Sequence, residues 1–295
     1  MRSSIRSLQT ITLLATTLAA ASAAFAEPPR WIVRDADSEL VLFPTIHALP
    51  EELAWKSDAM LAQLAEADEV WFEIDVAEAH GPQMQQLVME HGMAPDRPLS
   101  ERLDEALYAR FSEAADALGL PAAQLDAMRP WLASLTLSNV ALARAGFSAE
   151  AGVETRLRER VDDQQLRALE TAAGQIRMLA DLPEPMQVAL LESTLEDVDG
   201  FTEELRALAE DWARGDISGM EALLVEETAV EYPALHDAVF TQRNRRWVDI
   251  IEDELGGSGT DFIAVGAGHL VGGDSVVEML RERGWTVERI GGDDA

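Results

Sequence analysis

The stretch Asp261-Phe-Ile-Ala-Val-Gly-Ala-Gly-His-Leu-Val-Gly-Gly-Asp274 carries the pattern that decides the fold. Its apolar run, Phe262 to Val265, includes β-branched residues and is typical of a strand that is buried on both faces. Glycines follow at once and allow a sharp turn, which puts His269 at the end of the strand. Ligands of α/β proteins collect at the carboxyl ends of strands, so His269 is a candidate for chemistry. Its alternative role is a hydrogen bond to loop backbone.

Two further strand ends carry residues of the same kind. A strand expected from Glu39, apolar from Leu40 to Phe43, precedes Pro44, which breaks the pattern, and His47 follows three residues later. A strand expected at 69–76 carries Glu73 among apolar residues. That carboxylate is either on a solvated face or buried beside a partner such as a metal or an arginine. His47, Glu73 and His269 together are the ligand chemistry of an open divalent metal site.

The motifs at these strand ends resemble those of the TraB/GumN family, which is related to the Tiki metalloproteases. The second Gly-x-x-His motif of that family corresponds to Gly266-Ala-Gly-His269, and the first to Pro44-Thr-Ile-His47, where proline replaces glycine. The likeness extends over about residues 31–290. Its other matching segments are Trp71-Phe-Glu73, Leu169-Glu170-Thr171 with Gln175, Arg243-Asn244, and the terminal Gly-Trp-Thr-Val-Glu-Arg.

The resemblance implies roles for particular residues. His47, Glu73 and His269 would bind a divalent metal ion (Zn, Mn or Co) or share the activation of water. Arg243 would hold a catalytic carboxylate or a developing oxyanion, and its alternative role is a surface ion pair. The remaining implied contacts with substrate come from Glu170, Asn244, Gly266 and Gly268. Glu170 is equally well explained as a carboxylate at the start of a helix.

The expected fold class is α/β (α+β), with a mixed sheet built from both ends of the chain, and the resemblance makes it EreA/ChaN/Tiki-like. A hairpin is expected from residues 31–34 and 38–43, and a helix at 51–66. Helical patterns then occupy about 78–255 as an insertion in a single domain, 27–295, with a short strand at 166–169. A helix at 275–283, with Asp274 as N-cap and Gly284 at its end, precedes a closing strand at 285–290.

Residues 1–26 have the pattern of a Sec-type signal peptide. Arg2 and Arg6 precede an apolar run at 11–20, and Ala24-Phe-Ala26 is an Ala-x-Ala cleavage site. The chain is therefore expected in the periplasm or secreted, and no later segment has the roughly 20 apolar residues of a membrane span. The absence of cysteine excludes disulfides and thiolate chemistry. A net charge of −31 argues against nucleic acid as a partner.

These features predict an exported metal-dependent hydrolase, in particular a peptidase, that acts on a peptide or a small molecule. The alternative is a non-catalytic factor on the same scaffold that binds a peptide or is associated with a polysaccharide. Pro44 favours this alternative, because proline fixes its own φ and cannot donate a backbone hydrogen bond. The sequence leaves the substrate, the metal and the oligomeric state open.

Overall fold

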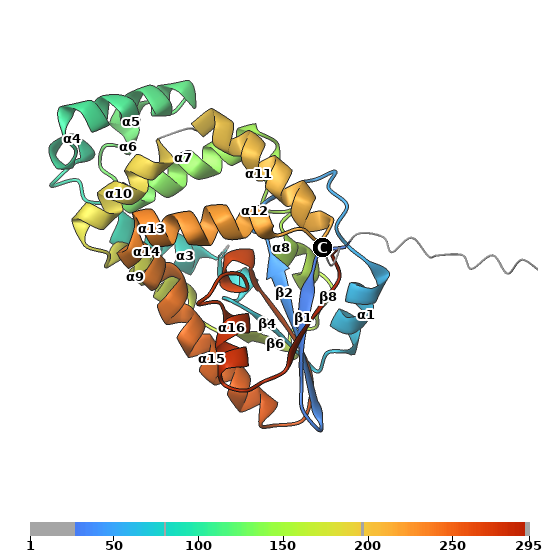
Figure 1. Ribbon diagram of the computed structural model, residues 1–295. Helices are drawn as coiled ribbons and strands as arrows, with labels where there is room; N and C mark the ends of the chain where they lie inside the picture. Colours follow the sequence, from blue (N-terminus) through green and yellow to red (C-terminus); the bar gives the residue numbers. More distant parts are fainter. Residues whose placement is uncertain (1–26, 80, 196–197, 293–295) are drawn as a thin grey trace, which may run out of the picture.

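A six-stranded mixed sheet forms the centre of the molecule (Figure 1). The computed structural model describes residues 27–79, 81–195 and 198–292, so the expected signal peptide lies outside the described part. The strand order is β6-β4-β7-β2-β1-β8, and β3 pairs separately with β5. The strands are β1 (Arg30–Arg34), β2 (Ser38–Thr45), β3 (Leu49–Pro50), β4 (Glu69–Phe72), β5 (Phe147–Ser148), β6 (Leu166–Ala168), β7 (Gly259–Gly266) and β8 (Val287–Ile290).

The four strands from β6 to β2 are parallel, whereas β1 and β8 are antiparallel to their neighbours. The long parallel pair joins the two ends of the chain, because β2 and β7 are in register from Ser38 with Gly259 to Thr45 with Gly266. The hairpin β1–β2 and the closing strand β8 are confirmed. The expected sheet from both chain ends is therefore present, and β6 adds one strand from within the helical insertion.

Most of the remaining chain is helical, and the insertion extends beyond one end of the sheet (Figure 1). The helices between residues 58 and 194 are α1 (Asp58–Glu66), α2 (Val76–Ala79), α3 (Pro82–Gly92), α4 (Leu99–Arg102), α5 (Glu105–Ala117), α6 (Ala122–Leu125), α7 (Pro130–Arg144), α8 (Val153–Arg158), α9 (Ala172–Ala180) and α10 (Glu184–Thr194). The later ones are α11 (Val198–Ala213), α12 (Ser218–Met220), α13 (Thr228–Glu231), α14 (Pro233–His236), α15 (Gln242–Leu255) and α16 (Val276–Glu282).

Several element boundaries differ from the prediction. Helix α1 starts at Asp58 rather than near residue 51, because the Ser57 hydroxyl caps it by accepting from the Met60 N–H. The strand expected at 69–76 ends at Phe72. Ser275, not Asp274, is the N-cap of α16, while Gly284 ends that helix region with a φ of +98°. Sequence periodicity gave no sign of the short elements α6, α8, β3 and β5.

The last part of the predicted helical insertion contains two π-helical segments. The segments are η1 (Glu221–Glu227) and η2 (Asp237–Thr241). Each packs against the loop that carries His269: a methyl group added to Gly272 would lie 2.7 Å from Val225 Cγ1 of η1, and one added to Gly268 would lie 2.7 Å from Phe240 Cε1 of η2. π-Helical turns occur often at functional sites. Here they hold the two sides of one glycine-rich loop.

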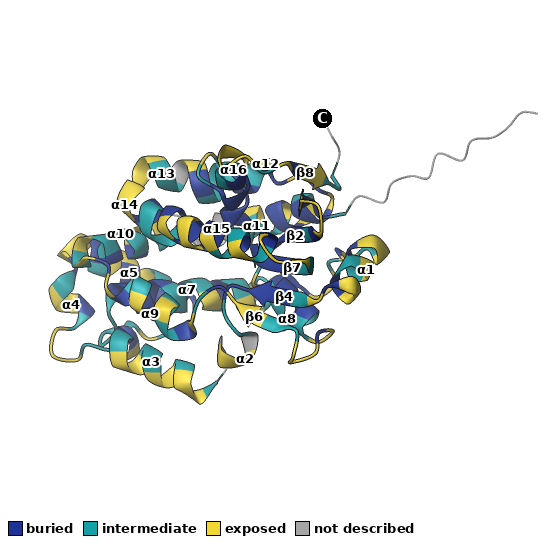
Figure 2. Ribbon diagram, turned by 90° about the horizontal axis from the view of Figure 1, so that it is seen from below, coloured by how far each residue is buried: buried dark blue, intermediate teal, exposed yellow. Residues whose placement is uncertain are grey.

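The main apolar core surrounds the sheet, and a second core lies within the insertion. Buried residues concentrate in β2, β7 and β4, whereas α3 and α4 carry many exposed residues (Figure 2). Helices α5, α7 and α10 form the second core, which includes Leu107, Leu137 and Leu191. Among the described residues, no helix is both long enough and apolar enough to cross a bilayer. The sheet and its core thus give a fixed edge on which functional residues can lie.

Candidate active site

Four polar residues follow the carboxyl ends of the four parallel strands. Glu170 comes after β6, Glu73 after β4, His269 after β7 and His47 after β2. Because these strands are neighbours and run in one direction, the four residues reach the same edge of the sheet. This edge is the usual ligand site of an open parallel sheet.

Glu73 and Glu170 lie side by side because the pairing of β4 and β6 continues past the strands. The Leu169 N–H donates to the Phe72 carbonyl at 2.9 Å, and the Glu170 N–H donates to the Glu73 carbonyl at 2.8 Å. Both carboxylates are largely buried, with 8% and 11% of their side-chain surface exposed. Two buried negative charges this close require a cation or several donors.

Arg243 supplies that cation from the first turn of α15. Its Nη2 donates to Glu73 Oε2 at 2.5 Å, and its Nε donates to Glu170 Oε1 at 2.9 Å. Trp247, one turn later, donates from Nε1 to the same Glu170 oxygen at 3.0 Å and has the guanidinium 4.7 Å above its ring. The two carboxylates raise the pKa of Arg243 despite its burial. Arg243 is therefore a permanent positive charge inside the site.

The second oxygen of Glu73 connects the carboxylate to the glycine-rich turn. The Gly266 N–H donates to Oε1 at 2.8 Å, and the Gln175 side chain donates to Oε2 at 3.0 Å. Burial favours a raised pKa for Glu73, but the Arg243 guanidinium, the charge of His47 and the Gly266 N–H outweigh it and hold the pKa at about 2. Glu73 is thus an anion whose oxygens are both engaged.

His269 is buried and neutral. Asn244 determines its tautomer: the Asn244 amide nitrogen donates to the Asp274 carbonyl at 2.8 Å, so its Oδ1 accepts from His269 Nδ1 at 2.6 Å. The lone pair of His269 is then on Nε2, where it accepts from Arg243 Nη1 at 3.0 Å. Burial first, and the charge of Arg243, lower the pKa of His269 to about 3.

His47 has the opposite environment. Its Nδ1 lies 2.6 Å from Glu154 Oε1, and the Thr45 hydroxyl donates to the same oxygen at 2.5 Å. The Glu154 carboxylate raises the pKa of His47. Since 72% of the His47 side-chain surface is exposed, water weakens this attraction. His47 is therefore an oriented and accessible imidazole with a carboxylate behind it.

Gly266 is the point at which these groups converge. A methyl group built on Gly266 would lie 3.0 Å from Glu73 Oε1, 3.7 Å from His269 Cδ2 and 3.8 Å from His47 Nε2. The last two distances limit the separation of the two imidazole rings at these atoms to at most about 7.5 Å, their sum. Residues 222 positions apart in the chain thus meet at one site, as the strand ends led us to expect.

The expected metal ligands carry suitable donor atoms, but their surroundings do not fit a bound cation. Glu73 and His269 both accept hydrogen bonds from the Arg243 guanidinium, which takes up the lone pairs that a metal would need. Among the described residues, no three His, Asp or Glu side chains are arranged to hold a metal ion. As they lie, these residues form an arginine-centred polar site.

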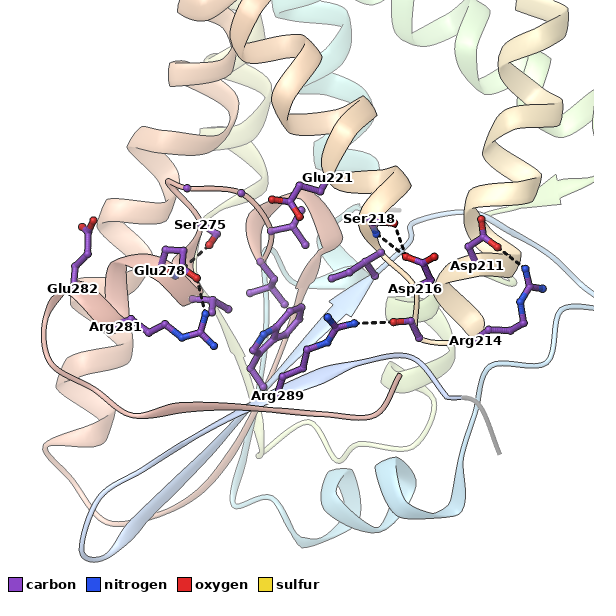
Figure 3. A pocket seen from close by; sticks show the side chains of 18 residues that line it. Asp211, Arg214, Asp216, Ser218, Glu221, Ser275, Glu278, Arg281, Glu282 and Arg289 are labelled. Carbon is purple, nitrogen blue, oxygen red and sulfur yellow. Dashed lines mark hydrogen bonds and ion pairs between the residues drawn. The ribbon is translucent and has the colours of Figure 1, made fainter. Parts of the chain in front are cut away.

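A separate cavity of about 1010 Å³ lies next to the same glycine-rich loop (Figure 3). Leu270 to Gly273 contribute to its lining, together with charged residues of three other segments. Arg214 pairs there with Asp211, Arg281 with Glu278, and Arg289 donates to the Gly215 carbonyl at 2.8 Å. His47, Glu73, Arg243 and His269 do not line this cavity, so it is distinct from the site at the strand ends.

The sequence singled out most of the residues that meet here but missed Glu154. The site includes Glu170, Arg243, Asn244 and the two motif glycines. Asn244, expected to contact substrate, is 1% exposed and contacts His269 instead. Gly268 packs against Phe240. In the sequence, the only hint near Glu154 is a glycine two residues earlier, Gly152. The structure shows why glycine is needed there: a methyl group on Gly152 would lie 2.1 Å from the His47 carbonyl oxygen. This close approach requires glycine and brings α8 up to His47.

Comparisons with known proteins agree with these motifs. Residues 29–289 match the sequence profile of the TraB/PrgY/gumN family. The chain is also similar to an uncharacterized protein of Treponema pallidum (strain Nichols), with 20% identity over 265 residues that cover 86% of this chain and 80% of that protein. No solved structure matches. Because the family profile covers most of the sequence, the chain belongs to the TraB/PrgY/gumN family.

Proposed function

We propose that the chain is a hydrolase that cleaves a peptide, or another small substrate with an amide or ester carbonyl, at the edge of the parallel sheet. The observation that carries this proposal is an accessible imidazole, His47, oriented by Glu154 and close to the buried Arg243–Glu73 pair. An oriented base beside a fixed positive charge is what the addition of water to a carbonyl requires.

In the proposed reaction, His47 is the general base. Its neutral form takes a proton from water at Nε2 while Glu154, at Nδ1, keeps the ring oriented and stabilises the imidazolium that forms. The same imidazolium then returns the proton to the leaving group. Because Glu154 raises the pKa of His47, activity should increase as the pH rises above neutrality.

Arg243 is the proposed stabiliser of the oxyanion. A guanidinium has five N–H bonds, and acceptors within the described residues account for four: Glu170, the Val239 carbonyl, His269 and Glu73. One N–H of Nη2 remains for the substrate oxygen. Glu73, Glu170 and His269 hold the guanidinium in place, so little reorganisation accompanies the reaction.

Metal-dependent hydrolysis by the same residues is the second candidate. The 3.9 Å between Glu73 Oε1 and His269 Nε2, with His47 nearby, favours it. This candidate requires Arg243 to leave both groups when Zn, Mn or Co binds. A chelator would abolish activity in this case and leave it unchanged if His47 acts alone.

A peptide-library cleavage assay tests the proposal. The protein is incubated with peptides of mixed sequence, with and without chelator, and the products are identified by mass spectrometry. Cleavage should disappear in His47→Ala and persist in the control His91→Ala, because His91, on α3, is not among the residues that contact His47, Glu73, Arg243 or His269 in the described structure. Tight peptide binding without cleavage would replace the hydrolase by the peptide-binding alternative.

We also propose export, on the basis of the signal-peptide pattern in residues 1–26. Cleavage after Ala26 gives a chain that begins at Glu27 and functions in the periplasm or outside the cell. N-terminal sequencing of the protein from a periplasmic extract tests this expectation. A chain that retains Met1 in the membrane fraction would contradict it.

A further inference from the structure

The guanidinium of Arg243 contacts both Glu73 and His269, the two buried side chains among the expected metal ligands. Nη2 contacts Glu73 Oε2 at 2.5 Å, and Nη1 contacts His269 Nε2 at 3.0 Å. Both contacts are among buried side chains, with Arg243 at 6% exposure, Glu73 at 8% and His269 at 4%. A single guanidinium therefore donates to both acceptor atoms in a space from which water is largely excluded.

His269 is oriented as a metal ligand would be. A ligating histidine commonly donates its other ring N–H to a carbonyl or carboxylate oxygen, which turns the free lone pair toward the ion. Asn244 Oδ1 accepts from Nδ1 here, and Asn244 is itself fixed by the Asp274 carbonyl. The prepared lone pair on Nε2 faces Arg243.

The spacing of the donors is also close to that of ligands. Two ligand atoms about 2.05 Å from one tetrahedral zinc ion are separated by about 3.4 Å. Glu73 Oε1 and His269 Nε2 are 3.9 Å apart. His47 Nε2 comes within 3.8 Å of a methyl position on Gly266 that is 3.0 Å from the same glutamate oxygen, and its exposed ring would have to turn away from Glu154 to reach the ion.

We infer that Arg243 takes the place of a divalent cation in this chain and that removing its side chain exposes a latent metal site formed by Glu73, His269 and His47. In the native chain, a bound ion would have to displace a guanidinium that two carboxylates and an imidazole hold. Without it, Glu73 is a buried anion that lacks its partner, and a divalent ion restores the missing charge. Imidazole and carboxylate ligands suit Zn, Mn and Co.

The experiment measures metal binding and thermal stability, so it is independent of the proposed hydrolysis. Isothermal titration with Zn, Mn and Co and thermal unfolding with and without each ion are applied to the native protein, to Arg243→Ala and to Arg243→Gln, which retains part of the side-chain volume. Arg245→Ala is the matched control, because Arg245 is an exposed arginine of the same helix. It reports any binding gained simply by removing a positive charge from an acidic protein.

We expect the native protein and Arg245→Ala to bind these ions weakly and the Arg243 variants to bind one equivalent at least 100-fold more tightly. The Tm of the Arg243 variants should fall and then recover with metal, and adding Glu73→Gln should remove the recovery. One-equivalent binding by the native protein that is lost in His269→Ala would overturn the inference. So would variants that fold but gain no affinity, or a gain that disappears with Glu221→Gln in the acidic cavity of Figure 3.

Discussion

The two histidine motifs follow neighbouring strands but give their imidazoles opposite environments. The His47 side chain is 72% exposed and pairs with a carboxylate, whereas the His269 side chain is 4% exposed and accepts from a guanidinium. The pKa of His47 is raised by Glu154, and the pKa of His269 is lowered by burial to about 3. The comparison teaches that similar spacing at similar strand ends does not imply the same role.

The difference arises from what covers each strand end. Helix α15 brings Arg243, Asn244 and Trp247 onto His269, and the Trp247 ring lies 4.2 Å from the imidazole. Within the part of the chain that the structure describes, the hydrogen bond of the His47 ring is to Glu154, in the N-terminal turn of α8, and no helix covers the ring as α15 covers His269. This difference supports the proposed roles: proton transfer for His47 and the positioning of Arg243 for His269.

The largest expected effect is that of His47→Ala on activity. Loss of a general base should reduce kcat/KM by about 10²–10⁴-fold. The free energy of unfolding should fall by no more than about 1 kcal/mol, because the ion pair that the exposed ring makes with Glu154 is screened by water. Urea denaturation and steady-state kinetics check both parts. A loss of several kcal/mol in stability would show that His47 is structural.

His269→Ala should mainly affect stability. The substitution leaves an N–H of Arg243 and the Asn244 oxygen without partners in a buried place, which should cost about 1–3 kcal/mol of unfolding free energy. Urea denaturation next to His47→Ala measures the contrast. Unchanged stability would mean that the buried hydrogen bonds of His269 are not formed in solution.

The two motifs should also give opposite dependences of stability on pH. For His269 the folded pKa is about 3 and the ordinary value is 6.5, so the unfolded chain binds more protons between them and stability falls as the pH drops through this range. Glu73, with a pKa of about 2, adds a loss below its ordinary value of 4.5. For His47 the folded pKa is the higher one, so its contribution is lost as the pH rises above 6.5.

Unfolding experiments across this pH range test these signs. In His269→Ala, the free energy of unfolding should fall less steeply as the pH drops below 6.5. In His47→Ala, it should fall less steeply as the pH rises above 6.5. An acid limb of the same slope in His269→Ala would assign the effect to other groups.

The smallest expected effect separates two glycines of the same loop. Gly266→Ala puts a methyl group 3.0 Å from Glu73 Oε1, so the carboxylate must shift by a few tenths of an ångström, and activity should fall by about tenfold because misplacing catalytic groups is costly. Gly273→Ala meets no atom within 4 Å and needs no left-handed backbone, so it is the matched control. Equal kinetics in both variants would remove Gly266 from the site.

The sequence predicted the sheet and the meeting of its strand ends because buried parallel strands leave a strong apolar signal. It could not predict which histidine is covered, since that depends on contacts of α15 and α8 across the fold. Glu73 was expected within a strand but lies one residue after β4. Pro44 was expected to end a strand, yet β2 continues through it to Thr45. Pairing with β1 extends only from Glu39 to Leu42, so Pro44 lies beyond the part of β2 that pairs with that strand.

The most direct test of the contrast is an NMR titration of the imidazole nitrogens. The chain has five histidines, so selective ¹⁵N labelling with single substitutions assigns each ring. We predict that His269 stays neutral from pH 8 to pH 4 with its proton on Nδ1, and that His47 titrates above 6.5 in the native protein and at a lower pH in Glu154→Gln. A His269 ring that titrates near 6.5 with its proton on Nε2, or a His47 pKa that Glu154→Gln leaves unchanged, would contradict the account.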